Sequence, residues 1–481
     1  MTRLSRFLSL LLCCMALPAW AGDDDHDKPG KTYGFGDAEI TLNLDAAFGL
    51  FSVANAQNGQ GSLSAGGRAK GGRDWAEGYI APGLNLDYFV NDTTFYGGVT
   101  LLGSATRGSG EAQRNSVTGT RPEKLELDQA YLGWKSGLAF AELGEDAVDV
   151  SAGRQGFVVG DGFLIADGTL DSFRRGAYVI GPRASFDNTA IARLNTQPVR
   201  ADLFHLEGNV DQQSLRGKDN AGSSLYGGNV EWFGSSHKDH GRAEYTERLW
   251  YLGATGLKVY DADRAINAGR DGMTVWSLRS GGTLLAPLSD AFKDFALYSE
   301  YARQNNNGPT SVSAKAWYVE PQYTFGNLPW SPRLSYRYMH YSGDSDTSDS
   351  RNTGWDSLYT AGGPRGYGSW DLGEIYARYI GGNSNLNSQL VQVKAQPLDD
   401  LSAGVTYYRH NFDKREAGVS SDRLLDEVNV FAVWDTPVKG LSISTVLGAA
   451  KAGDGRRQQQ ATTDPTDRTI WLGQMIAAYQ F

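Results

Sequence analysis

Five arginines alternate with apolar residues, and this spacing could place them on the water-facing side of a sheet. Arg333 and Arg337 alternate with Leu334, Tyr336 and Tyr338. Successive side chains of a strand point to opposite faces, so both arginines face away from the apolar row. The same alternation selects a set of five inward-facing arginines: Arg193, Arg200, Arg279, Arg333 and Arg337.

Guanidinium groups that line a narrow channel can select anionic solutes. Carboxylates fall on the same predicted face, so the arginines could equally form ion pairs that brace the wall. Tyr298 and Tyr318 are also predicted to face inward, where they could stack on sugar rings or only fill wall space. The predicted inward carboxylates are Asp45, Asp87, Glu300, Glu320 and Glu427.

Enzyme chemistry has little support in the residue pattern. The chain has no Gly-x-Ser-x-Gly, His-Glu-x-x-His or phosphate-binding motif. His237 and His240 are three residues apart in a predicted turn. They could bind a metal together, or they could be two solvated side chains of the turn. His410 lies near a predicted rim without a catalytic partner. The six histidines are scattered, so we expect no enzyme and no cofactor: His26, His205, His237, His240, His340 and His410.

The strands that would carry these side chains are long. Residues 38–53 alternate between apolar and polar for more than ten positions, longer than the usual strand of a soluble protein. An apolar row over residues 80–88 faces away from Asn85 and Asp87. Strands of this length and pattern are typical of a tilted membrane strand.

Connections between the predicted strands alternate in length. Short turns fall near residues 91–93, 136–137, 195–198, 234–241, 287–290, 326–329, 396–399 and 435–440. Long polar connections lie between them, including residues 160–171, 209–223, 343–367 and 451–467. This alternation predicts an all-β, antiparallel, up-and-down transmembrane barrel of about 18 strands with a water-filled lumen narrowed by loops. The strand pattern is weakest over residues 157–193 and 370–386.

Both chain ends fit this prediction. Residues 470–481 alternate with Trp471 and Phe481 on the uncharged face, as in a final barrel strand. Residues 1–21 read as a secretory signal that holds both cysteines, Cys13 and Cys14. We therefore expect a signal peptide (1–21), a polar, disordered periplasmic leader (22–36) and an outer-membrane barrel (37–481). No stretch is long and apolar enough for a helical span.

Composition agrees with a large barrel and excludes nucleic acid as a partner. Glycine accounts for 60 of 481 residues, well above the usual share of about one in fourteen. The formal charge is −10, and it becomes −12 when Arg3 and Arg6 leave with the signal. A net negative chain of this kind is not expected to bind a polyanion such as DNA or RNA.

Two stretches and the final strand resemble the alginate export family of outer-membrane barrels. They are Leu-Asp-Gln-Ala-Tyr-Leu-Gly-Trp (127–134) with Val-Asp-Val-Ser-Ala-Gly-Arg-Gln (148–155), and Asp-Glu-Val-Asn-Val (426–430) with Gly448, Gly453 and Asp454. The resemblance implies an eighteen-stranded monomeric channel for an anionic polysaccharide, with Arg154 as a pore arginine. Asp128-Gln129 departs from the family, which has an arginine near that position, and this puts alginate itself in doubt.

The expected function is therefore passive passage or secretion of an anionic polysaccharide or another polar solute across the outer membrane. An uptake porin for small organic acids or sugars is the alternative, and a plugged barrel acting as an enzyme or adhesin is a third. The expected partners are outer-membrane lipid, the barrel assembly machinery that reads a terminal Phe strand, and the solute.

Overall fold

A computed structural model describes most of the chain after residue 29. The described residues are 30–60, 62–64, 67–69, 72–109, 123–168, 176–177, 179–181, 185–209, 223–235, 248–262, 269–346, 348–360, 365–461 and 467–481. The predicted signal peptide, the leader up to residue 29, His26, His237 and His240 lie outside this part.

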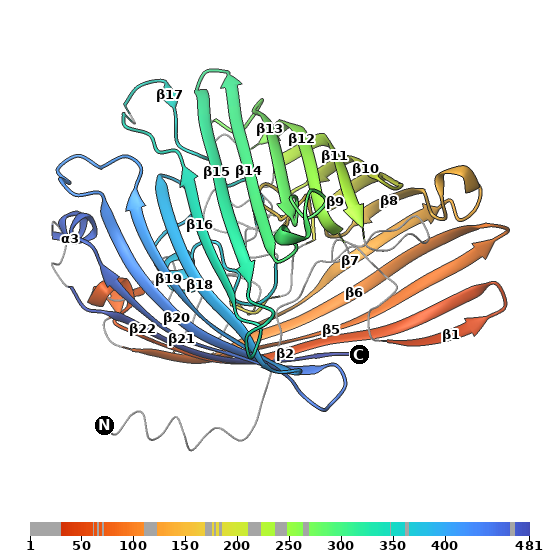
Figure 1. The fold of residues 1–481 in the computed structure, drawn as a ribbon, viewed down its shortest axis with the longest axis horizontal. Coiled ribbons are helices and arrows are strands. Elements are labelled where there is room, and N and C mark those ends of the chain that lie inside the picture. Colours follow the sequence, from red (N-terminus) through yellow and green to blue (C-terminus); the bar gives the residue numbers. More distant parts are fainter. Residues whose placement is uncertain are drawn as a thin grey trace.

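The wall of the molecule is one sheet that closes on itself (Figure 1). The sheet has 20 strands in the described chain; β1 and β17 each pair with one wall strand only, so 18 remain in the wall. Every neighbouring wall pair is antiparallel, and β22 closes the ring against β2. The predicted eighteen-stranded up-and-down barrel is confirmed. In chain order the wall strands are β2 (Ala38–Ala54), β5 (Arg73–Val90), β6 (Thr93–Gly108), β7 (Glu123–Lys135), β8 (Val148–Arg154), β9 (Asn188–Asn195), β10 (Val199–Glu207), β11 (Ser223–Ser235), β12 (Arg248–Ala262), β13 (Thr274–Gly282), β14 (Phe295–Asn307), β15 (Ser311–Thr324), β16 (Arg333–Tyr341), β18 (Leu386–Leu398), β19 (Leu401–Phe412), β20 (Arg423–Asp435), β21 (Leu441–Ala452) and β22 (Ile470–Gln480).

The two faces of the wall differ as the alternation predicts. Outward-facing Ile80 and Leu203 are 53% and 68% exposed, whereas inward-facing Arg337 and Glu231 are 1% and 0% exposed. An apolar outer face suits lipid, because a charge in the middle of that face costs about 2–4 kcal/mol. The burial of inward polar groups means that protein, and not only water, occupies the lumen.

The connections keep the predicted parity. Tight turns follow β5, β9, β18 and β20, and somewhat longer ones follow β7, β13 and β15. The opposite rim carries the long connections. The rule is not strict. The connections after β7 (136–147) and β13 (283–294) are longer than the one between β19 and β20 (413–422), and a hairpin of only residues 308–310 joins β14 to β15 on the long-loop side. Figure 1 shows that hairpin in green, at the top of the wall.

Residues 31–35, predicted to belong to the disordered leader, form a strand. β1 (Lys31–Phe35) pairs antiparallel with β2, from Lys31 opposite Leu42 to Phe35 opposite Ala38. A turn at Gly36, with φ 66°, lets the chain double back onto the free start of β2. Backbone pairing, rather than burial, holds this strand, since all its residues are exposed. Polar composition therefore gave the wrong prediction for these five residues.

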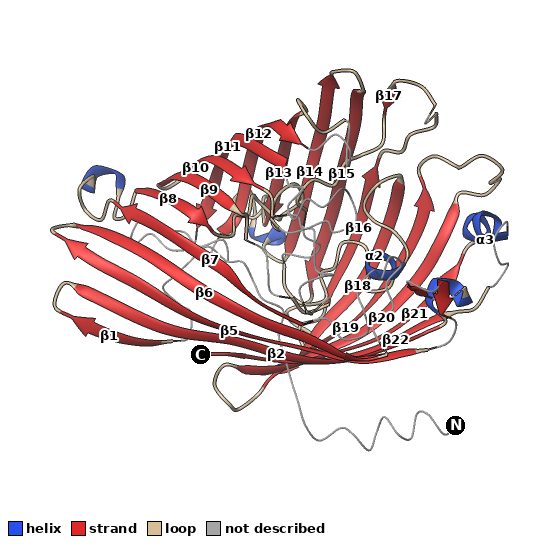
Figure 2. Ribbon diagram, turned by 180° about the vertical axis from the view of Figure 1, so that it is seen from behind, coloured by secondary structure: helices blue, strands red, loops and turns tan. Residues whose placement is uncertain are grey.

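Helical structure is confined to short pieces in the described chain (Figure 2). None of its helices is long and apolar enough to cross a membrane. The remaining elements are η1 (Ala56–Gly59), β3 (Ser62–Ser64), β4 (Gly67–Ala69), η2 (Ala141–Leu143), η4 (Asp290–Phe292), β17 (Arg351–Asn352), α2 (Tyr376–Tyr379) and α3 (Asp454–Ala461).

Candidate lumen constriction and its arginines

Two segments between wall strands fold into the barrel and pack on each other. The first inner segment (residues 155–168) follows β8, and the second inner segment (the described residues 353–360 and 365–381) lies between β17 and β18. Ile165 forms a parallel bridge with Tyr359, and the amide of Ala166 donates to the Tyr359 carbonyl at 2.8 Å. Ile165, Leu358 and Tyr359 are fully buried. These apolar contacts explain why the strand pattern is weak over 157–193 and 370–386, because the described residues that precede β9 at Asn188 and β18 at Leu386 form no wall strand.

Asp161 joins the tip of the first inner segment to the wall. Its carboxylate accepts hydrogen bonds from the Tyr251 hydroxyl of β12 at 2.8 Å and from the Tyr318 hydroxyl of β15 at 3.0 Å. Arg365, from the second inner segment, forms an ion pair with the same carboxylate and another with Glu320. Asp161 thus connects both inner segments to the same side of the barrel wall.

Arg337 forms the next part of this network. Its Nε donates to Glu320 at 2.6 Å, and its Nη1 donates to Asp371 at 3.0 Å and to the carbonyl of Trp370 at 3.1 Å. Arg337 therefore links the wall to the second inner segment. Glu320 is shared by Arg337 and Arg365, and three carboxylates surround the two guanidiniums.

Arg279 lies in a second buried network on the wall. Its guanidinium donates to Glu231 at 2.7 Å, to the Thr255 hydroxyl at 2.6 Å and to the Asn229 side-chain oxygen. Gly160 approaches it so closely that a β-carbon there would lie 2.5 Å from the Arg279 Nε. Gly160 also has φ +57°, a backbone conformation that L side chains rarely adopt, so a substitution there would be strained and would displace Arg279.

The three other arginines on β8, β9 and β10 are also paired. Arg154 forms an ion pair with Asp187 and donates to the Asp128 carbonyl at 2.9 Å. Arg193 lies 3.8 Å from Asp149 and 3.7 Å from Asp202, and Arg200 lies 3.4 Å from Asp202. Five of the six predicted arginines therefore sit in ion pairs, as the bracing interpretation expects.

Arg333 differs from the other five. It opens β16 directly after a short turn and stands opposite Lys394 of β18 in the register. Both side chains are partly exposed. In the described chain no carboxylate pairs with either group, and the Lys394 Nζ donates only to the carbonyl of Tyr367, at 3.3 Å. We call Arg333 and Lys394 the basic pair.

The predicted acidic and aromatic residues also face inward. Glu300 stands opposite Arg279 in the register, and Glu427 accepts from the Ile375 and Tyr376 amides at 2.8 Å each. Tyr298 lies under Arg365, whose guanidinium carbon is 4.4 Å from the ring centre. Tyr318 is buried, and Asp45 and Asp87 are half-buried on the inward face.

Sequence reasoning missed the arginines of the connections. Arg365 and Arg270 lie outside any strand, so alternation carries no signal for them. Arg270 forms an ion pair with Asp356 of the second inner segment. Burial alone would lower the pKa of both guanidiniums, but neighbouring carboxylates offset it and the pKa of each is raised. Burial raises the pKa of the Asp371 carboxyl, and Arg337 only partly opposes this.

The described histidines are not grouped with one another or with other metal-binding side chains. His410 is fully buried and stacks on Tyr376 and Tyr408, with ring centres 4.3 and 5.6 Å apart. His340 lies 3.7 Å from Asp413 and His205 contacts the Tyr260 hydroxyl at 2.6 Å. Across the described ranges no group of metal-binding side chains occurs.

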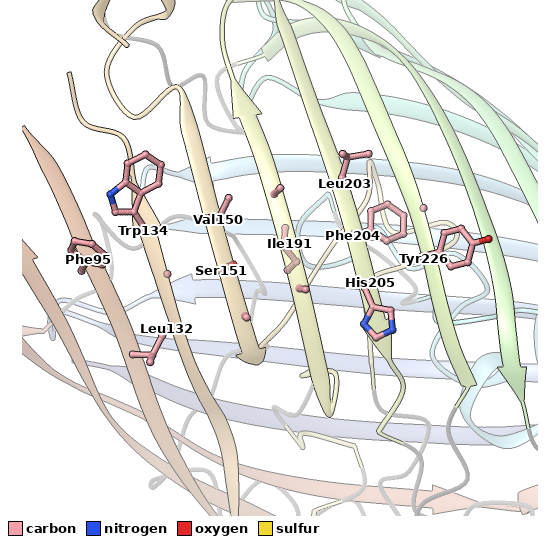
Figure 3. A pocket seen from close by; sticks show the side chains of 15 residues that line it. Phe95, Leu132, Trp134, Val150, Ser151, Ile191, Leu203, Phe204, His205 and Tyr226 are labelled. Carbon is pink, nitrogen blue, oxygen red and sulfur yellow. The ribbon is translucent and has the colours of Figure 1, made fainter. Parts of the chain in front are cut away.

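One depression lies on the outer wall rather than in the lumen (Figure 3). Leu132 and Leu203 border it, while small outward residues such as Ala152, Ala190 and Ala192 form its floor. The lining is almost wholly apolar, which suits lipid chains, and it lies on the opposite face of the wall from the arginine networks.

Comparison with known proteins gives a family and a fold. The sequence profile of the alginate export family matches residues 104–425. Among solved structures, a BenF-like porin from Pseudomonas fluorescens Pf-5 aligns with a TM-score of 0.55 and 11% identity, covering 92% of this chain and 98% of that one. OccK5 (OpdH) of Pseudomonas aeruginosa gives 0.52 and 11%, with the same coverage. OccK2 (OpdF) of Pseudomonas aeruginosa in complex with glucuronate gives 0.52 and 13%, covering 95% and 99%. No curated protein sequence matches significantly.

Proposed function

This chain belongs to the alginate export family, and we propose that this outer-membrane channel passes an anionic polysaccharide or another anionic polar solute. The protein is an outer-membrane β-barrel with the fold of porins. The substrate and the residues that select it are the proposal. We also propose that the barrel acts as a monomer without catalytic activity, and that the barrel assembly machinery inserts it.

The basic pair is the observation that carries this proposal. Arg333 and Lys394 lie on the inward face near the short-turn rim, which is the periplasmic rim in barrels of this kind. Two neighbouring positive charges without a carboxylate partner in the described chain attract an anion that arrives from the periplasm. Such a position suits a solute on its way out of the cell.

The paired arginines have a different role in this proposal. Arg337 and Arg365 hold the second inner segment against Glu320, and this segment narrows the lumen beyond the basic pair. Tyr298 lies under Arg365 and offers a ring face to a sugar near the constriction. Arg154, Arg193, Arg200 and Arg279 brace the wall and keep that geometry.

Uptake of small organic acids or sugars is the second candidate. The inner segments pack tightly on each other, which favours a small solute over a polymer. OccK2, a barrel of similar fold, has been solved with glucuronate bound, a single acidic sugar. The same basic pair would then act at the exit of the channel.

Ion selectivity of single channels in a planar bilayer tests the basic pair. In a salt gradient the wild-type protein should give a reversal potential of anion preference. Replacing Arg333→Glu and Lys394→Glu together should weaken or reverse that preference, because two charges act in a narrow and poorly screened space. The matched control replaces Lys293→Glu and Lys439→Glu, two exposed lysines in connections at the short-turn rim.

Block of the current by oligomers of a uronic acid then separates the two candidates. If long oligomers added on the periplasmic side interrupt the current and the basic-pair variant loses this block, secretion of a polymer is supported. Block by the monomer alone supports uptake. Cation preference in the wild type would refute anion selection by the basic pair, and with it the passage of an anionic polysaccharide or a small organic acid.

A further inference from the structure

The outward face of the β14–β15 hairpin carries an unusual polar strip. Arg303 stands opposite Lys315 in the register, and the next two outward pairs toward the hairpin tip are made only of neutral polar residues. No acidic or apolar side chain interrupts them. The three cross-strand pairs of this polar strip are Arg303–Lys315, Asn305–Ser313 and Asn307–Ser311.

A row of outward-facing aromatic side chains, which we call the aromatic girdle, lies directly below the polar strip. The outward pair just below it is Tyr301 opposite Trp317. The Trp276 ring packs on Tyr301 at 5.5 Å and the Tyr338 ring packs on Trp317 at 5.2 Å, so aromatic rings continue across β13 and β16. Such rings mark the boundary between hydrocarbon and headgroups. The first polar pair lies two residues, about 7 Å, further along the strands. At a tilt of about 40° that is roughly 5 Å above the girdle, at the level of lipid headgroups.

The two cations of the strip oppose each other without a counter-charge. Like charges directly opposite on a sheet are destabilising. Both side chains are exposed, and in the described chain neither forms an ion pair. The Arg303 Nε donates to the Asn305 side-chain oxygen at 3.1 Å, which holds the guanidinium along the hairpin. Lys258 of β12 is exposed and adds a third positive charge near the strip. It is aligned with Asn305 of the strip through Thr274 of β13, which stands opposite both residues in the register.

We propose that the polar strip binds the phosphate group of a lipid in the outer leaflet. A phosphate between Arg303 and Lys315 would offset their repulsion, and guanidinium forms paired hydrogen bonds with phosphate oxygens. The neutral side chains above them supply further donors. The aromatic girdle beneath receives the acyl chains of the same lipid. The charge and the position favour a phosphorylated lipid over a free anion, which would gain nothing from the girdle. The inference is independent of the lumen and of the transported solute.

Lipid retention by the purified full-length protein tests this site. Native mass spectrometry in detergent would measure binding of diphosphoryl lipid A, with the fully dephosphorylated lipid as comparison. We expect the wild type to retain the diphosphorylated form at least about tenfold better, as charge-assisted hydrogen bonds to phosphate predict. The variant Arg303→Gln with Lys315→Gln should lose this preference.

The matched control is Lys293→Gln with Lys439→Gln, which removes two exposed lysines at the opposite rim. It should retain the lipid as the wild type does. Heat-dependent gel mobility of both variants reports whether the barrel is folded, so misfolding is recognised before binding is compared. Equal binding of the two lipids, equal binding by the Arg303 and Lys315 variant, competition by equimolar inorganic phosphate, or a species of two protein chains in place of the lipid complex would each overturn the proposal.

Discussion

At the scale of single residues, Arg279 shows how dependent the buried charges are on each other. Glu231 is fully buried and has Arg279 as its ion-pair partner at 2.7 Å. Removing one member of such a pair leaves an uncompensated buried charge, which costs about 3–5 kcal/mol. We therefore expect Arg279→Met to lower the temperature at which the folded barrel converts to the slow-migrating band on a gel.

The double variant Arg279→Met with Glu231→Gln is the control for this prediction. Replacing both charges removes the uncompensated carboxylate, so it should recover a large part of the lost stability. An exposed arginine, Arg415→Met, should leave the conversion temperature unchanged. If the single and double variants are equally destabilised, packing and not charge is what Arg279 supplies.

Alternation predicted which face these side chains occupy but not what they contact. Arg333, Arg337 and Glu320 lie on the predicted inward face, because period two fixes sidedness within a strand. Their partners come from the connections, where no period exists. Arg365 and Asp161 are the clearest cases, and the only sequence cue for Asp161 is its position between Gly160 and Gly162. Arg333 could not be told from Arg337 by sequence, although among the described residues only Arg337 has carboxylate partners.

At the scale of elements, the second inner segment is attached to the lumen wall by named contacts. Arg365 pairs with Glu320, Asp356 pairs with Arg270, and the Tyr359 hydroxyl donates to the Ser223 carbonyl at 3.1 Å. We expect deletion of residues 354–381, replaced by a short Gly–Ser linker, to raise single-channel conductance by about twofold or more. The reason is that a barrel of 18 strands leaves a wide lumen when no segment fills it.

Shortening of the connection between β19 and β20 is the control. Residues 414–420 are mostly exposed and contact α3 at the rim through Gln458 and Gln459. Their removal should leave conductance unchanged. Unaltered conductance in the 354–381 deletion, with the barrel still folded, would mean that the inner segment does not limit the passage of ions.

Composition predicts a long polar connection over residues 343–367, and we expect such a loop to be mobile or to fold over the mouth of the barrel. The structure places the described residues 353–360 deeper, inside the barrel, where Trp355 and Tyr359 are buried. Its aspartates divide accordingly, since Asp346 and Asp349 remain exposed at the rim while Asp356 reaches Arg270. Composition could reveal a long polar loop, but the inward course depends on contacts with residues far away in the chain.

At the scale of the whole molecule, the wall was predictable because every strand repeats one rule. Each strand needs an apolar row toward lipid and hydrogen-bonded neighbours on both sides, and the apolar row is visible in the sequence of most strands. The count of 18 followed from it even though residues 157–193 and 370–386 were ambiguous. The rule did not predict β1, because Lys31–Phe35 lies outside the closed ring of strands and pairs with one neighbouring strand only.

Closure of the ring gives the last prediction. β22 pairs with both β2 and β21, and the amides of Leu44 and Phe481 donate to each other's carbonyls at 2.8 and 2.9 Å. Deletion of residues 470–481 would expose the edges of β2 and β21 to lipid, where unpaired backbone groups cost several kcal/mol each. We expect the truncated chain to be absent from outer-membrane fractions and to be degraded in the periplasm, as judged by immunoblot. Phe481→Trp keeps the strand and an aromatic side chain, so it should assemble normally. Normal insertion of the truncated chain, with heat-dependent mobility intact, would show that β22 is not needed to close the barrel.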